Sequence, residues 1–99
     1  MTLTPQDKRR LKSLGQTMPD DVRVGHDGLT DGGAAHVAAL LARKELVKVR
    51  FEELEGARRK AFAAELADAL DAQCITVVGR TALLYRPNPD LDPARRVLQ

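Results

Sequence analysis

The part of the sequence with the clearest potential for chemistry is a short loop with two glycines three positions apart. The loop consists of Gly25, His26, Asp27 and Gly28. Glycine has no Cβ, so an anion can approach the main chain closely there. A helix is predicted to begin after Thr30, and the free amides of its first turn favour an anion at the same place. The spacing predicts a loop that holds a phosphate, although a tight strand-to-helix turn would also use glycine.

A cluster of cations near the N-terminus could contact further phosphates. It consists of Lys8, Arg9 and Lys12, with Arg10 beside them. No acid interrupts this cluster, and we therefore expect it to contact a polyanion. A solvated helix face is the alternative, because charged residues make up 30% of the chain. The later basic run 58–60 is flanked by Glu55 and Glu65, and we interpret it as a solvated face.

Three more cations are expected on the sheet. Lys48 and Arg50 alternate with apolar residues along the strand predicted at 46–52, so they project from the face opposite the core. Arg80 is expected at the tip of a two-residue hairpin, where Gly79 supplies the positive φ that such a turn requires. The sequence leaves the strand order open, and with it the question of whether these cations share one surface.

The elements that must position these side chains are three helices and four strands. Apolar periodicity predicts helices near residues 5–15, 31–44 and 58–71, and strands at 22–24, 46–52, 74–78 and 81–85. The order is α-β-α-β-α-β-β, which favours an α+β two-layer sandwich on a four-stranded mixed sheet, with helices chiefly on one face. Leu11 and Leu14 should form the buried stripe of the first helix. One apolar face of the final hairpin should carry Ile75, Val77, Ala82 and Leu84.

Length and composition restrict the classes of protein that remain. The 99 residues suit one domain, which we place at 1–87, followed by an extended or mobile tail at 88–99. Aromatic residues make up only 3%, which argues against modules that stack bases on an aromatic sheet. A single cysteine, Cys74, and two histidines give no metal-ligand spacing, and we expect no metal or cofactor. With no signal-peptide pattern and no apolar run of about 18 residues, we expect a cytoplasmic protein.

Four blocks of the sequence, taken in order, resemble the YhbY-like proteins that are built from one CRM domain (chloroplast RNA splicing and ribosome maturation). The blocks are residues 3–12, 24–32, 44–50 and 77–87, so the resemblance covers nearly the whole predicted domain. It implies a fold like the C-terminal domain of a bacterial initiation factor. It also implies RNA binding and, for stand-alone bacterial members, association with ribosomal RNA in precursors of the large ribosomal subunit. Relatives often carry a basic or small polar residue in the middle of the loop, whereas this chain has His26 and Asp27.

The resulting hypothesis is that the protein is an assembly factor without enzymatic activity, which binds RNA through one loop and a set of cations. The predicted RNA contacts are Gly25, His26, Asp27, Gly28, Lys8, Arg9, Lys12, Lys48, Arg50 and Arg80. We expect a monomer with no small-molecule substrate and no membrane association. An enzyme that holds a nucleotide phosphate lacks a Gly-Lys-Ser/Thr element and a paired-carboxylate constellation here. The remaining alternative is a ribosome-associated protein-interaction module without direct RNA recognition.

Overall fold

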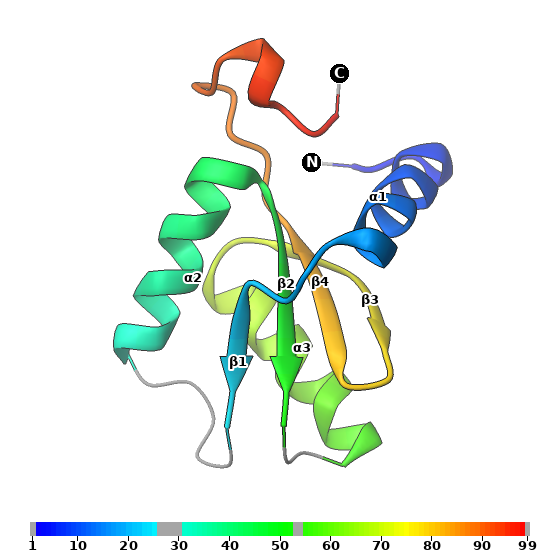
Figure 1. The fold of residues 1–99 in the computed structure, drawn as a ribbon, viewed down its shortest axis with the longest axis vertical. Coiled ribbons are helices and arrows are strands. Elements are labelled where there is room, and N and C mark those ends of the chain that lie inside the picture. The colour runs from blue at the N-terminus through cyan, green and yellow to red at the C-terminus, as the bar shows by residue number, and fades with distance from the viewer. Residues whose placement is uncertain (1, 26–30, 53–54, 99) are drawn as a thin grey trace.

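The computed structural model describes residues 2–25, 31–52 and 55–98, and it has the predicted element order (Figure 1). The helices are α1 (Pro5–Thr17), α2 (Asp31–Lys44) and α3 (Gly56–Ala69), followed near the C-terminus by the 3-10 helix η1 (Pro93–Arg95). The strands are β1 (Val22–Val24), β2 (Leu46–Phe51), β3 (Gln73–Val78) and β4 (Thr81–Tyr85). The predicted α+β fold is confirmed. Among the described residues, no helix has both the length and the apolar character needed to span a membrane.

The sheet is mixed, with the strand order β1-β2-β4-β3. β1 runs parallel to β2, while β4 is antiparallel to both β2 and β3. The carboxyl ends of β1 and β2 therefore lie at the same edge as the β3–β4 hairpin, at the bottom of Figure 1. In that hairpin Gly79 has a φ of 57°, the positive value predicted for the first turn position.

The main core lies between the sheet and the two helices α2 and α3. Val47, Val49 and Phe51 of β2 point into it and are fully buried, as the alternation along this strand predicts. The Phe51 ring meets that of Phe62 from α3 in an edge-to-face contact, with ring centroids 5.5 Å apart. Each such side chain stabilises the fold by about 1.5–3 kcal/mol through burial. This face of the sheet is the one that helices were expected to cover.

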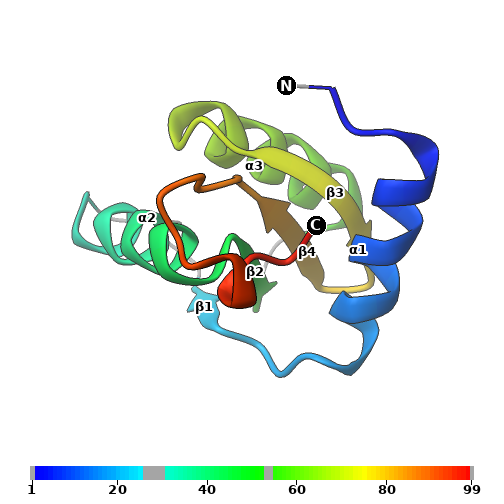
Figure 2. The same ribbon diagram turned by 90° about the horizontal axis from the view of Figure 1, so that it is seen from above.

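A second, smaller core lies on the opposite face, where α1 and the C-terminal segment cover part of the sheet (Figure 2). It contains Leu3, Leu11, Leu46, Leu83 and Tyr85, with Val97 and Leu98 packed against it. The predicted buried stripe of α1 was wrong at Leu14, whose side chain is 38% exposed. Helical spacing pairs Leu11 with Gly15 instead, and a Cβ on Gly15 would lie only 2.6 Å from Leu83 Cδ2. The absent side chain lets α1 lie directly on the sheet.

The predicted apolar face of the final hairpin was wrong at one residue. The pairing of β3 with β4 shifts between Cys74 and Thr76, so Ile75 is an extra residue in β3. Because a bulge reverses the alternation of side chains before it, Cys74 packs against the main core and Ile75 against the second core. Thr76 consequently lies on the open side of the sheet.

The segment for which an extended or mobile tail was expected returns to the domain over residues 88–98. The fully buried carboxylate of Glu45 accepts hydrogen bonds from the main-chain amides of Asn88 (2.6 Å) and Val97 (2.8 Å). It also accepts one from Arg96 Nε at 3.3 Å. Glu45 itself has a φ of 66°, directly after α2. The division of the chain at residue 87 stays a prediction, but its two sides share a hydrogen-bonded junction.

Candidate nucleic-acid interface

Gly25 ends β1 at the lower edge of the sheet and is exposed. A Cβ added to it would meet no atom within 4 Å, and its φ lies outside the left-handed region. Neither packing nor backbone conformation within the described chain therefore requires glycine at this position. This favours an external contact over a tight turn as the reason for the missing side chain. His26, Asp27 and Gly28 lie outside the described residues, so their roles stay predictions.

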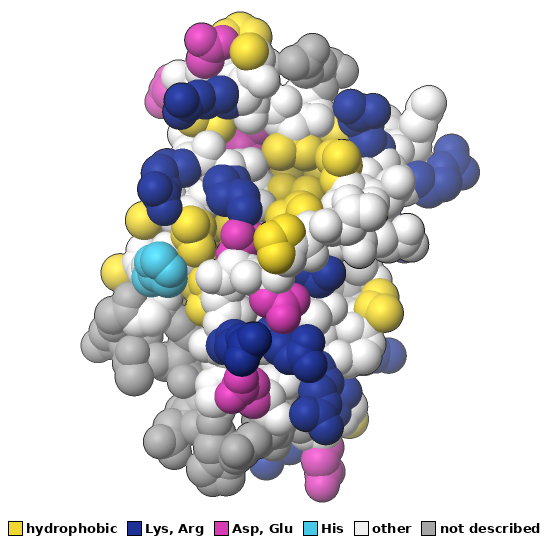
Figure 3. Space-filling view, viewed as in Figure 1, with side chains coloured by type: hydrophobic (Ala, Val, Ile, Leu, Met, Phe, Trp, Pro, Cys, Tyr) yellow, Lys and Arg dark blue, Asp and Glu magenta, His cyan; other side chains and the backbone are white. Residues whose placement is uncertain are grey.

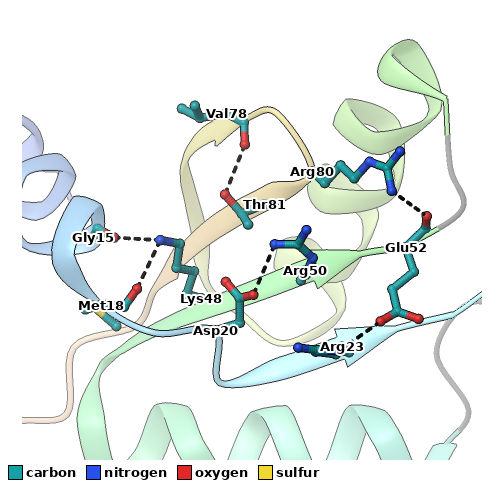
Figure 4. Close-up of polar contacts among 10 residues, drawn as sticks. All are labelled: Gly15, Met18, Asp20, Arg23, Lys48, Arg50, Glu52, Val78, Arg80 and Thr81. Carbon is teal, nitrogen blue, oxygen red and sulfur yellow. Dashed lines mark hydrogen bonds and ion pairs between the residues drawn. The ribbon is translucent and has the colours of Figure 1, made fainter.

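Beside Gly25, three arginines gather on the open face of the sheet; we call Arg23, Arg50 and Arg80 the arginine row. Arg23 is paired with Arg50 across β1 and β2, and Arg50 is paired with Thr81 across β2 and β4. Paired positions point to the same face, so the two arginines lie side by side. Arg80 comes from the adjoining hairpin (Figure 4). Lys and Arg side chains cover this lower part of the open face, with acidic side chains among them (Figure 3).

The ion pairs of the arginine row are long and solvated. Arg23 Nη1 lies 3.5 Å from Glu52 Oε1, with the two side chains 71% and 44% exposed. Arg50 Nη1 lies 3.4 Å from Asp20 Oδ2, with the two side chains 42% and 21% exposed. Such surface pairs contribute about 0–1 kcal/mol each. A guanidinium has five N–H donors, so these residues can bind phosphate while keeping, or at little cost exchanging, their carboxylate partners.

Arg80 adds a third guanidinium to the same edge. Its Nη1 donates to the main-chain oxygen of Glu52 at 3.3 Å, so Glu52 lies between Arg80 and Arg23 (Figure 4). Among the described residues Arg80 has no carboxylate partner, so three cations meet two acidic side chains in the row. The described side chains of the row and its two acidic partners therefore carry one net positive charge. Such a surface attracts a phosphate backbone without reading its sequence.

Lys48, which was also predicted to contact phosphate, forms hydrogen bonds within the fold. Its Nζ donates to the main-chain oxygens of Gly15 (3.0 Å) and Met18 (3.1 Å), as Figure 4 shows. These carbonyls belong to the last turn and the C-cap of α1, where helix carbonyls lack partners within the helix. Lys48 therefore fastens α1 to the sheet. Its ammonium has three donors, and two of them are engaged.

The predicted cluster on α1 faces two directions. Lys8, Arg9 and Lys12 are all exposed. Lys8 and Lys12 are four residues apart and share a helix face, and Lys12 lines a groove together with Lys48. Arg9 and Arg10 line a separate concavity with Arg96 of the C-terminal segment. The structure thus brings Lys12 to the side of α1 that meets the open sheet face, and turns Arg9 toward the C-terminal segment.

Arg23 is the residue of this surface that the sequence prediction missed. The triplet 22–24 alternates apolar, basic and apolar, and this pattern already placed Arg23 opposite the core. Its neighbour in space is set by the parallel pairing of β1 with β2, which is not readable from a three-residue strand. The alternation alone was the available signal.

Two features of the described residues bear on metal binding and on the reactivity of the cysteine. They contain no group of three or more His, Cys, Asp or Glu side chains placed to hold a metal ion. Burial raises the pKa of the Cys74 thiol, which outweighs the lowering by its hydrogen bond to the Thr76 carbonyl. A raised pKa keeps the thiol protonated at neutral pH, which is the opposite of what a nucleophilic cysteine needs.

Comparison with known proteins gives consistent matches over nearly the whole chain. The family model described as the CRS1/YhbY (CRM) domain matches residues 3–86. A protein of Pseudomonas aeruginosa named a probable RNA-binding protein is 34% identical over 89 residues, covering 90% of this chain and 86% of the relative. One of Haemophilus influenzae named an RNA-binding protein is 27% identical over 89 residues, covering 90% of each.

The fold has a solved counterpart as well. The solution structure of a Staphylococcus aureus protein superposes with a TM-score of 0.80 at 24% identity, covering 92% of this chain and 95% of that one. The similarity extends beyond residue 86, where the family model ends. At this level of identity the match establishes the fold.

Proposed function

Because the chain belongs to the CRS1/YhbY (CRM) domain family, we propose that it binds RNA through the loop after β1, the arginine row and the cations of α1. The names of two relatives that align with 90% of the chain support this proposal. The observation that carries it is the pairing of Arg23 with Arg50 on an open sheet face beside Gly25. In this arrangement Gly25, His26, Asp27 and Gly28 contact the RNA backbone through main-chain amides, and the cations supply most of the affinity.

The finer proposal concerns which RNA is bound. The four-block resemblance supports ribosomal RNA in precursors of the large subunit, with the protein acting in the cytoplasm as an assembly factor and not as an enzyme. The scarcity of aromatic side chains fits this role, because the described surface offers cations and main-chain amides in place of a stacking platform. Recognition would then depend mainly on the shape and phosphate pattern of a structured RNA.

The test measures affinity for structured fragments of large-subunit ribosomal RNA over a range of salt concentrations. Each phosphate contact should contribute roughly 0.7–0.9 to the slope of log affinity against log salt. Replacing Lys8 and Lys12 with Glu should weaken binding and flatten this slope. The matched control replaces Arg58 and Lys60, exposed cations of α3, with Glu, and should leave both unchanged.

Equal effects of the two pairs would show that net charge, and not this surface, determines binding. The alternative function, a protein-interaction module that reaches the ribosome without RNA recognition, predicts a different result. Recruitment to large-subunit precursors would then be independent of salt and would survive both double substitutions. That outcome would contradict the proposal of direct RNA binding.

A further inference from the structure

A groove lies between the C-terminal half of α1 and the open face of β3 and β4. Its volume is about 300 Å³, at the lower end of the range of roughly 300–1,000 Å³ typical of small-molecule sites. The lining residues are Lys12, Gly15, Gln16, Lys48, Thr76, Val78, Thr81 and Leu83. A space of this size suits one nucleotide unit and is too small for a double helix.

Two local features shape the groove. Gly15 has no side chain, and any Cβ there would collide with Leu83, whose side chain forms part of the floor. The bulge at Ile75 sets the register that turns Thr76 outward beside Leu83, its partner in β4. The contact of Gly15 with Leu83 thus closes the floor of the groove, and the irregular strand places Thr76 in its wall.

The chemistry of the groove is that of a site for a flat, partly polar ring. Val78 provides most of the aliphatic surface, since it is 66% exposed although it is a large apolar residue on an edge strand, and the buried Leu83, 4% exposed, lies at the floor. The side chains of Gln16, Thr76 and Thr81 add polar groups at the walls. The Thr81 hydroxyl donates to the Val78 carbonyl at 3.0 Å (Figure 4), so its lone pairs face outward as acceptors.

The positive charges around the groove favour a ring that is attached to an anionic chain. Lys12 lies at the wall, and Lys48 is held in place by the carbonyls of Gly15 and Met18. Arg50 follows Lys48 by two positions on the same face of β2, which connects the groove to the arginine row. Among the residues that the structure describes, no acidic side chain lines the groove.

We propose that this groove receives one unpaired base of the bound RNA, while the phosphates on either side contact Lys12 and the arginine row. The inference rests on the proposed function and sharpens it, because it makes single-stranded or bulged RNA the preferred substrate. The base lies on Leu83 and Val78, and the hydroxyl and amide groups at the walls meet its polar edge. The groove is a second kind of contact, distinct from the main-chain clamp expected at the loop after β1.

The experiment compares two ligands with the same number of phosphates: a ten-nucleotide single-stranded RNA of mixed sequence and a fully abasic ribose-phosphate strand of equal length. The protein should bind the RNA about tenfold more tightly, the lower end of what one base contact contributes. Methyl resonances of Val78 and Leu83 should shift on addition of the RNA and not of the abasic strand.

Two variants assign the preference to the groove. Thr76→Phe fills it with a residue that strands accommodate well, and should reduce the tenfold preference to about unity. Val78→Thr keeps the β-branched shape of an exposed residue and should reduce the preference severalfold, so the assignment does not depend on the folding of the first variant. The control Ser13→Phe makes the same kind of change on an exposed position of α1 outside the groove and should leave the preference intact.

The outcomes separate this inference from the proposed function. Equal affinity of the wild-type protein for the two strands would overturn the inference and leave RNA binding through phosphates intact. A preference that persists in both Thr76→Phe and Val78→Thr would also overturn it, because the base would then lie elsewhere. Failure to bind either strand at low salt would overturn the inference, while the salt titration with structured ribosomal RNA fragments tests the proposed function separately.

Discussion

Arginine side chains meet carboxylates in two regions of this molecule, at the arginine row and around Glu45. At the row, Arg23 and Glu52 are both largely in water, and their closest atoms are 3.5 Å apart. At Glu45 the carboxylate is fully buried, and two main-chain amides complete its hydrogen bonds alongside Arg96. An arginine–carboxylate pair can therefore exchange partners at the arginine row but not at Glu45. The free energy needed to separate the two groups is small in water and large when the carboxylate is buried.

Arg86 belongs with the fixed group. Its guanidinium donates to the main-chain oxygens of Leu70 (2.9 Å) and Ala38 (3.0 Å), which joins the middle of α2 to the C-cap of α3. The described cations therefore divide by their surroundings: Lys48, Arg86 and Arg96 contact main-chain oxygens or a buried carboxylate within the fold, whereas the arginine row lies at the surface. Within the row, Arg23 and Arg50 pair with carboxylates, and Arg80 donates to the main-chain oxygen of Glu52. Counting basic residues in the sequence does not make this division.

The largest expected effect is a loss of stability when the buried carboxylate of Glu45 is changed. Glu45→Gln keeps the size of the side chain but replaces the charge and puts an amide donor among donors. We expect a loss of about 3 kcal/mol in the free energy of unfolding, and a Tm lower by roughly 15 °C in thermal unfolding.

Glu52→Gln is the matched control, because it removes the carboxylate of an exposed pair. It should change the free energy of unfolding by less than about 0.5 kcal/mol. If the two variants were equally stable, the C-terminal segment would not depend on Glu45, and the contrast between the regions would be lost.

The second largest effect is expected on RNA affinity when the exposed arginine row is changed. Replacing Arg23, Arg50 and Arg80 together with Gln should reduce affinity for structured ribosomal RNA about 100-fold near physiological salt. The slope of log affinity against log salt should become shallower by roughly 2–3, because three phosphate contacts are removed. Filter binding or fluorescence anisotropy at several salt concentrations measures both quantities.

Arg86→Gln provides the reciprocal test, since Arg86 donates only to main-chain carbonyls in its described contacts. It should lower the Tm and leave the salt slope of RNA binding unchanged. If Arg86→Gln flattened the salt slope as much as the triple substitution of the arginine row does, the distinction between structural and RNA-binding arginines would be contradicted.

Much of this contrast was visible in the sequence, and the part that was not has a physical reason. Alternation placed Lys48 and Arg50 on the face opposite the core, and this is where they lie. The sequence could not show that Lys48 reaches the end of α1, because that contact joins residues 30 and 33 positions apart. Local periodicity reports the side of an element that a residue occupies, and not the groups that fold back to meet it.

The C-terminal segment shows the same limit. Three prolines after Arg86 favour an extended chain, and nothing local reveals that Glu45 would bind its amides. The bulge at Ile75 likewise arises from tertiary pairing with β4, while the regular alternation of the sequence predicts an unbroken strand. The element order and the inward-facing side of β2 were predictable because both follow from local apolar periodicity.

The third prediction separates two lysines that the sequence treated alike. Lys48→Met should lower the free energy of unfolding by about 1.5 kcal/mol, because the carbonyls of Gly15 and Met18 lose a charged donor. Lys12→Met, on the exposed face of α1, should leave stability nearly unchanged and flatten the salt slope by roughly 0.7–0.9. Chemical denaturation and salt titration of both variants give the comparison, and an exchange of the two outcomes would contradict the assigned roles.

The smallest expected effects distinguish two exposed glycines at the same edge of the sheet. Gly79 has a φ of 57°, so Gly79→Ala should cost about 1 kcal/mol of stability through backbone strain. Gly25 has neither a left-handed φ nor a close neighbour, so Gly25→Ala should change stability by less than about 0.5 kcal/mol.

If the loop after β1 holds RNA through its main chain, the added Cβ at residue 25 nevertheless weakens binding severalfold, while Gly79→Ala leaves the affinity of the folded protein unchanged. Because a residue that matters only to the ligand must be silent in denaturation, the pair tests the loop more sharply than a bulky substitution would. Unchanged RNA affinity in Gly25→Ala would assign the loop to chain reversal and leave the cations as the whole of the interface.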